Sequence, residues 1–548
     1  MVTSTPWRRP AGMTGEPDLI RIGTLSGEDD EFNCPSQKSV KVRPKIRPLV
    51  RPTRSTESLE AFGMGPLMTA VNQIEFLGMA PEKVKETLGA AKIPLHPGLI
   101  HFTQHAIDIY AWPTAVDGAT RLRPVSNLWA VQSVREYTWE MYAWGRRYES
   151  ADKTYREFRF LRFGAAGERE RDRTQIAIAA YTTAFGVETP WPDPWHEPMQ
   201  PAHKSPEVRH VRIIEYGIAD GTMVTLFDGT TAEAEEYFRV HGRHQILDIA
   251  SGTDKRPGSA CTGCKQLAGC DTLRRLPGLL GITARRAPLR KVSISDLRYY
   301  EQCPAQAHLR SLSLPKAYEY SEEAELGQAV HHWLERGHDG RRCMVVTPPA
   351  GAAGWSSGKW TVRGDPAVIG RQMIAHHQSV CALECLSTIS EVQLEPRLTF
   401  HDTAAQAIVI AKPDMLYLDD GAWIWREIKT TQKSRWFHNE ILEEFPQLAL
   451  GVIVLAEGAL GGEVTASRVE LEVLRPSGSD IVLIDPTDPE RVATARAVVR
   501  EMTESWRADD VFEARPGRTC RWCPVSRWCP SFPGDQLDPD THEGMMDG

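Results

Sequence analysis

The segment 407–429 constrains the fold of this chain more than any other stretch of its sequence. Two runs rich in β-branched and aromatic residues flank an Asp-Gly pair at 420–421, which tolerates the positive φ angles of a tight type I′ turn. With this pair as the turn, the strand register places Asp414 directly across from Glu427. Lys429 lies two residues beyond Glu427 and therefore shares its face of the sheet. The sequence predicts two carboxylates and one lysine together on a β-hairpin.

Opposed carboxylates repel each other, so this arrangement needs either a compensating cation or full exposure to water. Mg²⁺ is a natural compensation, because it binds one or two protein carboxylates and keeps positions open for water and phosphate oxygens. A lysine beside it can steady an attacking water or the charge that builds on phosphorus. The alternative is an exposed hairpin with an incidental ion network, since Asp, Glu and Lys are common on solvated strand faces.

Short motifs around the hairpin resemble the PD-(D/E)XK nuclease superfamily. Pro-Asp at 413–414, followed by Glu-Ile-Lys at 427–429, is similar to the signature of that superfamily. The stretch 327–335 resembles the helix of RecB-like members that carries a metal-binding histidine, here His331, whereas His332 points about 100° away around the helix. The resemblance implies metal-dependent hydrolysis of DNA, with Lys429 positioning the nucleophile. The ligands it implies for Mg²⁺ or Mn²⁺ are His331, Asp414, Glu427 and the carbonyl of Ile428.

Gln447 is similar to the glutamine that opens the third RecB-family motif, which implies a contact in the catalytic groove. The family motif usually continues to a tyrosine four residues later, and this chain has Gly451 there. The sequence therefore supports only part of the DNA contact that the resemblance implies. The alternative is that Gln447 only begins a buried helix.

Cysteines give a second motif. Cys303 precedes the hairpin, and Cys520, Cys523 and Cys529 follow it with a Cys-x2-Cys-x5-Cys spacing. Four thiolates from two distant segments can hold an iron–sulfur cluster or a tetrahedral zinc ion, or can pair as disulfides. The layout resembles the iron–sulfur RecB-like exonucleases, including CRISPR-associated and AddB-type proteins, and this resemblance implies a [4Fe-4S] cluster. The first residues offer no apolar signal segment, so we expect a cytoplasmic protein with reduced thiols.

The same cysteine spacing recurs at Cys261, Cys264 and Cys270, which indicates an internal repeat. The stretch 155–159 aligns with 425–429, and in each copy a strand pair and a helix precede the cysteines. We therefore predict an α/β fold with tandem restriction-endonuclease-like mixed sheets flanked by helices, the C-terminal copy closed by the iron–sulfur cluster.

The first copy is expected to be inactive. Counting the same offset back from Glu157 places Trp144 at the position of Asp414, and Arg159 replaces the lysine. Magnesium is not bound by an aromatic ring, and arginine is permanently charged.

The first copy also has Gly65 where Cys303 aligns in the second. Cys34, which is followed by proline as Cys303 is, can complete the set if the N-terminal segment folds back. Otherwise these cysteines bind zinc together with a histidine, or pack as reduced thiols.

The expected domains are a flexible, basic, proline-rich arm (1–54), a degenerate nuclease-like domain (55–280), a nuclease domain (290–532) and a disordered acidic tail (533–548). The arm is either a linker or a segment that touches phosphates. In the proline-rich loop 187–205, tryptophans either stack on bases or pin the loop to its own domain.

The composition is compatible with these domains and argues against a membrane protein and against a generally basic nucleic-acid-binding surface. The chain has 548 residues, 41% of them hydrophobic, a net charge of -8 and a pI near 6.1, so any DNA groove must be locally basic. A run of about 18 apolar residues is absent from the sequence, which argues against a membrane span. We predict a metal-dependent DNA exonuclease of repair, recombination or CRISPR and phage DNA processing, with a helicase or recombination partner. The alternative is a non-catalytic iron–sulfur or zinc protein that binds DNA ends as a scaffold subunit.

Overall fold

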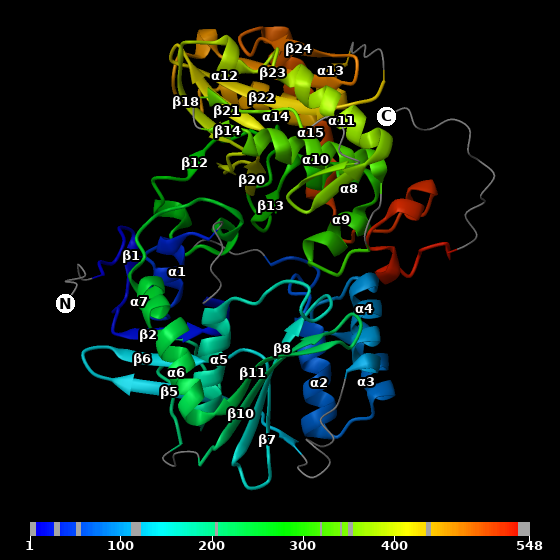
Figure 1. The fold of residues 1–548 in the computed structure, drawn as a ribbon. Helices are drawn as coiled ribbons and strands as arrows, with labels where there is room; N and C mark the ends of the chain where they lie inside the picture. The colour runs from blue at the N-terminus through cyan, green and yellow to red at the C-terminus, as the bar shows by residue number, and fades with distance from the viewer. Residues whose placement is uncertain are drawn as a thin grey trace.

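The chain forms two lobes, an N-terminal lobe at the bottom of Figure 1 and a C-terminal lobe at the top. A computed structural model describes residues 7–26, 33–50, 56–110, 122–202, 207–317, 321–339, 342–348, 354–433 and 440–534. Most of the predicted acidic tail lies outside these residues. In the part of the chain that is described, no helix combines the length and apolar character needed to cross a membrane.

Both lobes mix strands and helices. The strands of the N-terminal lobe are β1 (Met13–Thr14), β2 (Leu19–Gly23), β3 (Arg47–Pro48), β4 (Arg123–Pro124), β5 (Leu128–Val134), β6 (Thr138–Tyr142), β7 (Arg146–Glu149), β8 (Tyr155–Arg162), β9 (Val187–Thr189), β10 (His210–Gly217) and β11 (Met223–Thr230). Its helices are α1 (Pro35–Lys41), α2 (Gly65–Leu77), α3 (Pro81–Thr87), α4 (Pro97–Ile109), α5 (Arg173–Phe185), α6 (Thr231–His241) and α7 (Arg243–Ser251).

The strands of the C-terminal lobe are β12 (Arg274–Arg275), β13 (Arg290–Val292), β14 (His338–Asp339), β15 (Arg342–Cys343), β16 (Gly354–Ser357), β17 (Trp360–Arg363), β18 (Ile389–Leu394), β19 (Leu398–Asp402), β20 (Ala407–Ala411), β21 (Met415–Asp419), β22 (Ala422–Thr430), β23 (Arg468–Arg475) and β24 (Gly478–Ile484). Its helices are α8 (Ile294–Gln302), α9 (Pro304–Ser311), α10 (Glu322–Arg336), α11 (Gly364–His377), α12 (Ala382–Cys385), α13 (Ile441–Glu444), α14 (Pro446–Ala456) and α15 (Pro489–Ala508).

The main sheet of the C-terminal lobe has the strand order β18-β21-β22-β23-β24. The β21–β22 and β23–β24 pairs are antiparallel, while β22 and β23 run parallel and are joined through α14. Helices α14 and α15 cover one face with the largest apolar core of the lobe, and α10 and α11 cover the other. The predicted mixed sheet flanked by helices is therefore present.

The predicted hairpin has the register expected from its turn. Asp420 and Gly421 have φ angles of 48° and 81°, and Asp419 pairs with Ala422. The turn residues determine this register because they leave a loop of two residues, and the strands then pair one to one. Asp414 stands one residue before β21, at the end of the ladder where Glu427 follows on the partner strand.

The N-terminal lobe repeats this arrangement of strands. In its sheet β11-β10-β8-β7-β4, the β7–β8 and β10–β11 pairs are antiparallel, whereas β8 and β10 are parallel and joined through α5. The order and sense match β21, β22, β23 and β24. In both lobes a helix follows the last of these strands and short 3-10 turns carrying the cysteine triplet follow later.

One residue of the repeat alignment was wrong. The register of β7 and β8 places Tyr148, and not Trp144, directly across from Glu157. The loop between β7 and β8 is longer than the two-residue turn of the C-terminal hairpin, so an offset counted along the sequence does not transfer. Like Trp144, Tyr148 supplies no carboxylate.

The N-terminal segment differs from the expected flexible arm. Residues of β2 are all buried, and this strand pairs in parallel with β6 in a second sheet of order β2-β6-β5-β9. Arg21 of this strand is buried, and its charge is offset by Glu140, whose Oε2 lies 2.6 Å from Arg21 Nε. A short strand with one paired charge at its centre does not stand out in the sequence from a polar arm.

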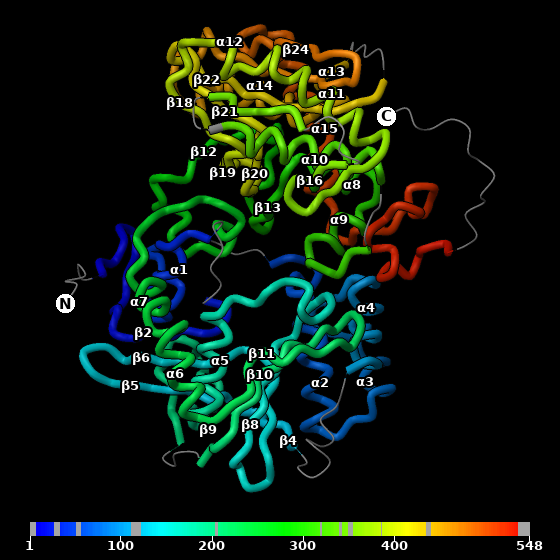
Figure 2. The backbone as a smooth tube through the Cα atoms, viewed as in Figure 1, coloured from blue at the N-terminus to red at the C-terminus, as the bar shows by residue number. Residues whose placement is uncertain are grey.

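Each lobe is contacted by a segment that carries a cysteine triplet. Figure 2 shows the red segment, which holds the last described residues, next to α4. Trp528 packs edge-on against Phe102 of α4, with ring centroids 4.9 Å apart. In the other direction, Cys261 and Leu273 pack against Ile408 of β20. Strand β12, which follows the first cysteine triplet, also pairs with β19 of the C-terminal lobe. Each cysteine triplet therefore lies where one lobe meets the other.

Acidification is expected to weaken this junction. His308 stacks on Phe512, and its ring centroid is 5.0 Å from that of His96. Burial, together with the nearby His96 and Arg290, lowers the pKa of His308 to about 3, and burial also lowers the pKa of His96. Because both folded-state pKa values lie below the unfolded value near 6.5, stability is complete above that pH and falls as the pH drops below it.

For His308 the expected loss at pH 5.5 is about 1.4 kcal/mol relative to pH 8. The measurement is the thermal unfolding midpoint between pH 8 and pH 5.5 for the wild type and His308→Phe. The phenylalanine variant should lose less on acidification, and an identical slope in both proteins would contradict the assignment.

Candidate functional site

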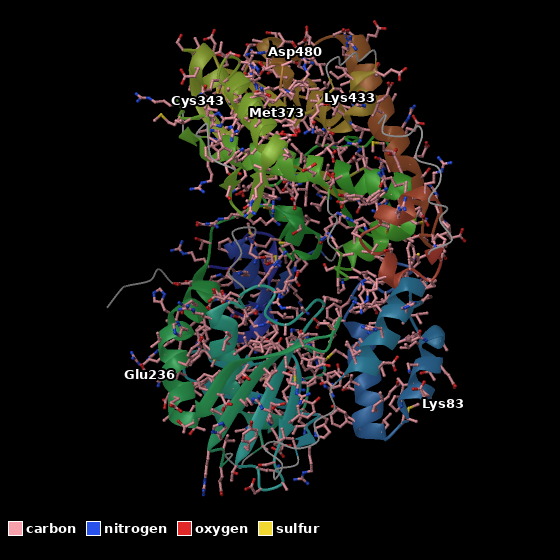
Figure 3. The ribbon with its side chains drawn as sticks, turned by 45° about the vertical axis from the view of Figure 1, so that its right-hand side comes forward. Lys83, Glu236, Cys343, Met373, Lys433 and Asp480 are labelled. Atoms are coloured by element: carbon pink, nitrogen blue, oxygen red, sulfur yellow. The ribbon has the colours of Figure 1, made fainter. Side chains whose placement is uncertain are left out.

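Asp414, Glu427 and Lys429 meet at one edge of the main sheet. The Nζ of Lys429 lies 3.3 Å from Glu427 Oε2 and 3.7 Å from Asp414 Oδ2, so both carboxylates face the same point. Glu427 is 5% exposed, whereas Asp414 and Lys429 are partly open. Figure 3 draws the side chains as sticks and labels Lys433, which lies three residues after the end of β22. The structure thus brings together the three residues that the hairpin register predicted.

Helix α10 adds a histidine to the same place. Nδ1 of His331 is 3.5 Å from Asp414 Oδ1, and the backbone N–H of Ile428 donates to Asp414 Oδ2 at 2.7 Å. His332 points away and its Nδ1 lies 2.7 Å from Ser357 Oγ, as the helical angle between the two histidines requires. An imidazole nitrogen and two carboxylates form a donor set that fits a hard divalent ion such as Mg²⁺ or Mn²⁺.

The two carboxylates have opposite electrostatic environments. Burial alone would raise the pKa of Asp414, but the hydrogen bond from His331 and the charge of Lys429 outweigh it and hold the value at about 2. Burial and the charge of Asp414 outweigh the opposing charge of Lys429 and raise the pKa of Glu427 to about 7. A cation between them would offset their repulsion and favour the ionised form of both.

Two further carboxylates line the small cavity beside His331 and Asp414. Glu335 follows His331 by one helical turn on α10, and Glu395 stands at the end of β18. Glu395 has a φ of 43°, and its backbone N–H donates to the carbonyl of Asp414 at 3.0 Å. Glu395 was not predicted from the sequence, because it enters the site through the pairing of β18 with β21.

Gln447 is the second residue of α14 and is partly buried. Its role in catalysis stays a prediction. The departure at Gly451 has a structural reason, because a Cβ there would lie 3.0 Å from the indole of Trp425. That indole donates from Nε1 to Glu427 Oε1 at 3.0 Å. Gly451 therefore leaves room for a side chain that orients a site carboxylate.

The variant Gly451→Ala is expected to displace Trp425 by a few tenths of an ångström and to disturb Glu427. We expect a roughly tenfold fall in metal-dependent activity, since small errors in the position of a reacting group are costly. The measurement is activity as a function of Mn²⁺ concentration. Trp425→Phe, which removes the same hydrogen bond but keeps a ring, should give a similar loss, and full activity in both would contradict this role.

The residues that form this site lie in a region that is similar to a known protein family. Residues 291–530 match the family described as the PD-(D/E)XK nuclease superfamily. These residues form a PD-(D/E)XK nuclease superfamily domain. A search of curated proteins finds no match. A solved structure described as "Crystal structure of SSO0001" is 16% identical, covers 44% of this chain and 85% of its own, and superposes with a TM-score of 0.22.

The same domain contains a second feature. One cavity in it is lined by Cys303, Cys520, Cys523 and Cys529. Cys303 is the N-cap of α9, and the backbone N–H of Arg515 donates to its sulfur at 3.4 Å. The N–H of Gly517 donates to the sulfur of Cys520 at 3.3 Å. The structure thus gathers the four predicted cysteines, which we call the C-terminal cage.

The N-terminal lobe contains a matching set. Cys34, Cys261, Cys264 and Cys270, the N-terminal cage, line one cavity. Cys34 is the N-cap of α1, as Cys303 is of α9, and it accepts hydrogen bonds from the N–H groups of Gln37 and Arg256 at 3.4 Å. The N-terminal segment therefore folds back and supplies the fourth cysteine. Gly65, the aligned position, instead begins α2.

The two cages use the same backbone contacts. An Arg-Pro-Gly segment precedes each triplet, at 256–258 and at 515–517, and its arginine and glycine N–H groups donate to the first two sulfurs of each cage. Backbone N–H groups directed at thiolates stabilise their negative charge. Burial raises the pKa of Cys264 to about 12 and that of Cys523 to about 11, so without a metal these thiols stay neutral.

The tryptophans of the loop 187–205 pack within their own lobe. Trp191 and Trp195 stack on each other with centroids 5.0 Å apart, and both contact the edge of Tyr142. Arg21 lies over the ring of Trp195 at 4.3 Å. These contacts favour the interpretation that they pin the loop, although half of Trp191 is exposed.

A fourth group of metal-binding residue types was not predicted from the sequence. His338, Cys343, His377 and Cys381 have ligand atoms that all lie within 4.8 Å of one another. Neither cysteine belongs to a Cys-x2-Cys motif, and the histidines stand 39 positions apart, so the sequence pattern is weak. The sequence pattern that could have indicated this group is a pair of short spacings, His-x4-Cys from His338 to Cys343 and His-x3-Cys from His377 to Cys381.

Proposed function

We propose that the nuclease domain is a Mg²⁺- or Mn²⁺-dependent exonuclease that hydrolyses phosphodiester bonds of single-stranded DNA or duplex ends. The observation that carries this proposal is the approach of Lys429 Nζ to both Asp414 and Glu427, with His331 on the third side. One buried and one partly exposed carboxylate that face one cation and one histidine suit phosphodiester hydrolysis, in which negative charge accumulates at phosphorus.

In this proposal Asp414, Glu427, His331 and the carbonyl of Ile428 hold the divalent ion. When bound, the ion supplies a lowered pKa for its water and offsets charge on the phosphate. Lys429 holds the attacking water in line and donates to the developing charge, while Gln447 contacts the strand. Water adds to phosphorus, one P–O bond to the neighbouring sugar breaks, and the leaving oxygen takes up a proton.

The C-terminal cage is proposed to hold a [4Fe-4S] cluster, and the N-terminal cage a second one. Each cage takes one cysteine from a helix N-cap and three from a Cys-x2-Cys-x5-Cys segment, and backbone N–H groups donate to two of its sulfurs. Four thiolates with such backbone donors suit an iron–sulfur cluster, whose charge and potential depend on hydrogen bonds to sulfur.

The N-terminal lobe is proposed to be a degenerate copy that no longer binds a catalytic ion. Arg159 Nε donates to Glu157 Oε1 at 2.7 Å, and Tyr148 occupies the place across the strands. Tyr148 donates to Glu75 Oε1 at 2.7 Å and contacts Tyr110. In this lobe Tyr148 therefore stands at the position that the carboxylate of Asp414 occupies in the other lobe. The lobe then serves as a scaffold that binds DNA or a helicase or recombination partner.

The test is a cleavage assay with Mn²⁺ on end-labelled linear and closed circular single-stranded DNA of the same sequence. Mononucleotides or short oligonucleotides released from linear DNA alone would support an exonuclease. Cleavage of circles would show an endonuclease, and binding of DNA ends without cleavage in either metal would favour the scaffold function instead.

A further inference from the structure

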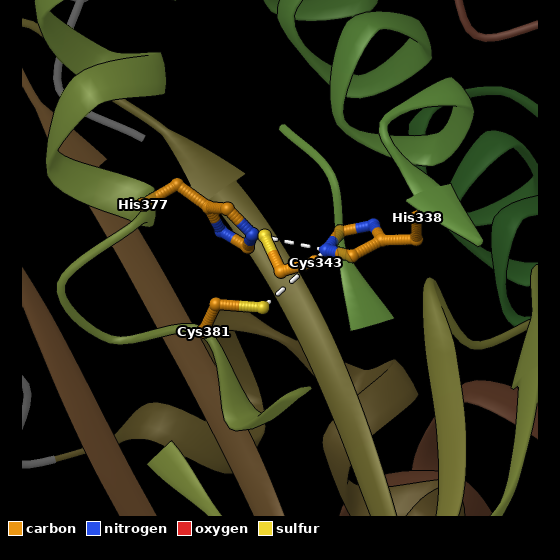
Figure 4. A group of neighbouring side chains, drawn as sticks. All are labelled: His338, Cys343, His377 and Cys381. Atoms are coloured by element: carbon orange, nitrogen blue, oxygen red, sulfur yellow. Dashed lines mark hydrogen bonds between the residues drawn. The ribbon is translucent and has the colours of Figure 1, made fainter. Parts of the chain in front are cut away.

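The group formed by His338, Cys343, His377 and Cys381 lies in the C-terminal lobe and shares no residue with either cysteine cage. Figure 4 shows the four side chains converging from β14, β15, the last turn of α11 and the residue before α12. Four separate elements thus contribute one side chain each. Cys381 also belongs to a buried apolar cluster, and Cys343 packs against that cluster, so the group lies at the edge of the core.

The distances fit a single small ion. His338 Nε2 lies 3.2 Å from His377 Nε2 and 3.4 Å from Cys381 Sγ, and all four ligand atoms lie within 4.8 Å of one another. A tetrahedral zinc ion with two sulfur and two nitrogen ligands separates them by roughly 3.3–3.8 Å. The group is thus close to this geometry before any side chain moves.

The burial of the group favours a structural site. His377 and Cys381 are 0% exposed and His338 is 7% exposed. A catalytic zinc site keeps one position open for water, whereas four protein ligands close the coordination shell. Two sulfurs and two imidazoles also match the ligand preference of zinc better than that of Mg²⁺ or Ca²⁺, which bind oxygen.

A carboxylate orients one of the histidines. Nδ1 of His377 lies 2.5 Å from Glu472 Oε1, and Glu472 is itself 0% exposed and held by Arg426 Nη1 at 3.2 Å. With its Nδ1 proton directed at Glu472, His377 presents the lone pair of Nε2 to the centre of the group. Metal-binding histidines commonly carry such a carboxylate partner on the other ring nitrogen.

We infer that His338, Cys343, His377 and Cys381 bind a structural Zn²⁺ ion. The ion would connect the β14–β15 segment that follows α10 with the end of α11 and the start of α12. Through the contact between His377 and Glu472, it would also be linked to β23 of the main sheet. His338 also lines the small cavity beside His331 and Asp414, so the two sites are neighbours. The four zinc ligands are distinct from the residues of the proposed nuclease chemistry, and the inference does not depend on that chemistry. Zinc binding adds folding free energy to a region where the β14–β15 pair has only two residues in each strand.

The first test uses the wild-type protein, purified without a polyhistidine tag and without added metal. Elemental analysis is expected to find about one zinc per chain, and X-ray absorption at the zinc edge should show two sulfurs at about 2.3 Å and two nitrogens at about 2.0 Å. Absence of zinc, or a shell of four sulfurs, would overturn the inference. A disulfide between Cys343 and Cys381, detected by mass after alkylation without reduction, would do so as well.

A matched pair of variants gives the second test. His377→Gln should lose zinc, whereas His376→Gln should keep it, because His376 Nε2 is directed at the carbonyl of Pro476. Should His377→Gln not fold, Co²⁺ exchange into the wild type serves instead, with the visible absorption of tetrahedral thiolate-bound cobalt as the readout. Retention of zinc by folded His377→Gln, or wild-type protein that exchanges no cobalt, would contradict the assignment.

Discussion

Replacing Lys429 by alanine is expected to lower the rate of DNA cleavage by roughly 10²–10³-fold. Lys429 faces both site carboxylates, and in the proposed reaction it donates to charge that develops in the transition state. Because that charge is absent from the bound ground state, the loss should appear in the single-turnover rate and much less in DNA affinity. The measurement is single-turnover cleavage of end-labelled linear DNA with saturating Mn²⁺.

The N-terminal lobe suggests a second substitution at this position. Arg159, the counterpart of Lys429, is held at Glu157 by a 2.7 Å hydrogen bond from its Nε. An arginine is a fixed planar fork, whereas a lysine is a mobile point charge. Lys429→Arg should therefore keep the positive charge and still lose most of the activity. This variant separates the shape of the cation from its charge.

Lys83→Ala is the matched control, because it removes one exposed lysine from the N-terminal lobe, as labelled in Figure 3. Its cleavage rate should equal that of the wild type. Cleavage that survives unchanged in Lys429→Ala would mean that this lysine does not serve the reaction. Equal loss in Lys83→Ala would point to nonspecific loss of DNA binding.

The hairpin site was predictable because local chemistry determined it. An Asp-Gly turn sets the register, and the register sets which residues face each other. The same reasoning failed for Trp144, because the loop before β8 is longer and has no pair of residues that requires one turn type. Tyr148 takes the position instead. Register can be read from sequence only where the turn is tightly specified.

Contacts between distant segments were harder to predict. Cys34 reaches its cage from more than 200 residues away, and nothing local to it distinguishes this partner from a reduced thiol. Glu395 likewise enters the site through the pairing of β18 with β21. Buried β2 was missed because the charge at its centre is offset by Glu140, a partner that the sequence does not reveal. In each case the deciding interaction is tertiary.

Loss of one cysteine ligand from the C-terminal cage should have the largest effect on stability. In Cys303→Ser, we expect iron content to fall to about half and the thermal unfolding midpoint to drop by roughly 10 °C or more, since cluster binding also supplies folding free energy. Cys303 joins α9 to the C-terminal turns, and Trp528 of those turns packs on α4. The loss should therefore loosen the contact between lobes, measured as faster limited proteolysis.

Cys34→Ser supplies the matched comparison in the N-terminal cage. It should also lose about half of the iron, but it loosens a different contact, that of Cys261 and Leu273 with Ile408 of β20. The two variants should then share the same iron loss and differ in their first sites of proteolysis. Full iron content in folded Cys303→Ser would contradict the C-terminal cluster, and unchanged iron in Cys34→Ser would restrict the protein to one cluster. Zinc content should stay constant in both, because neither residue belongs to the group around His377.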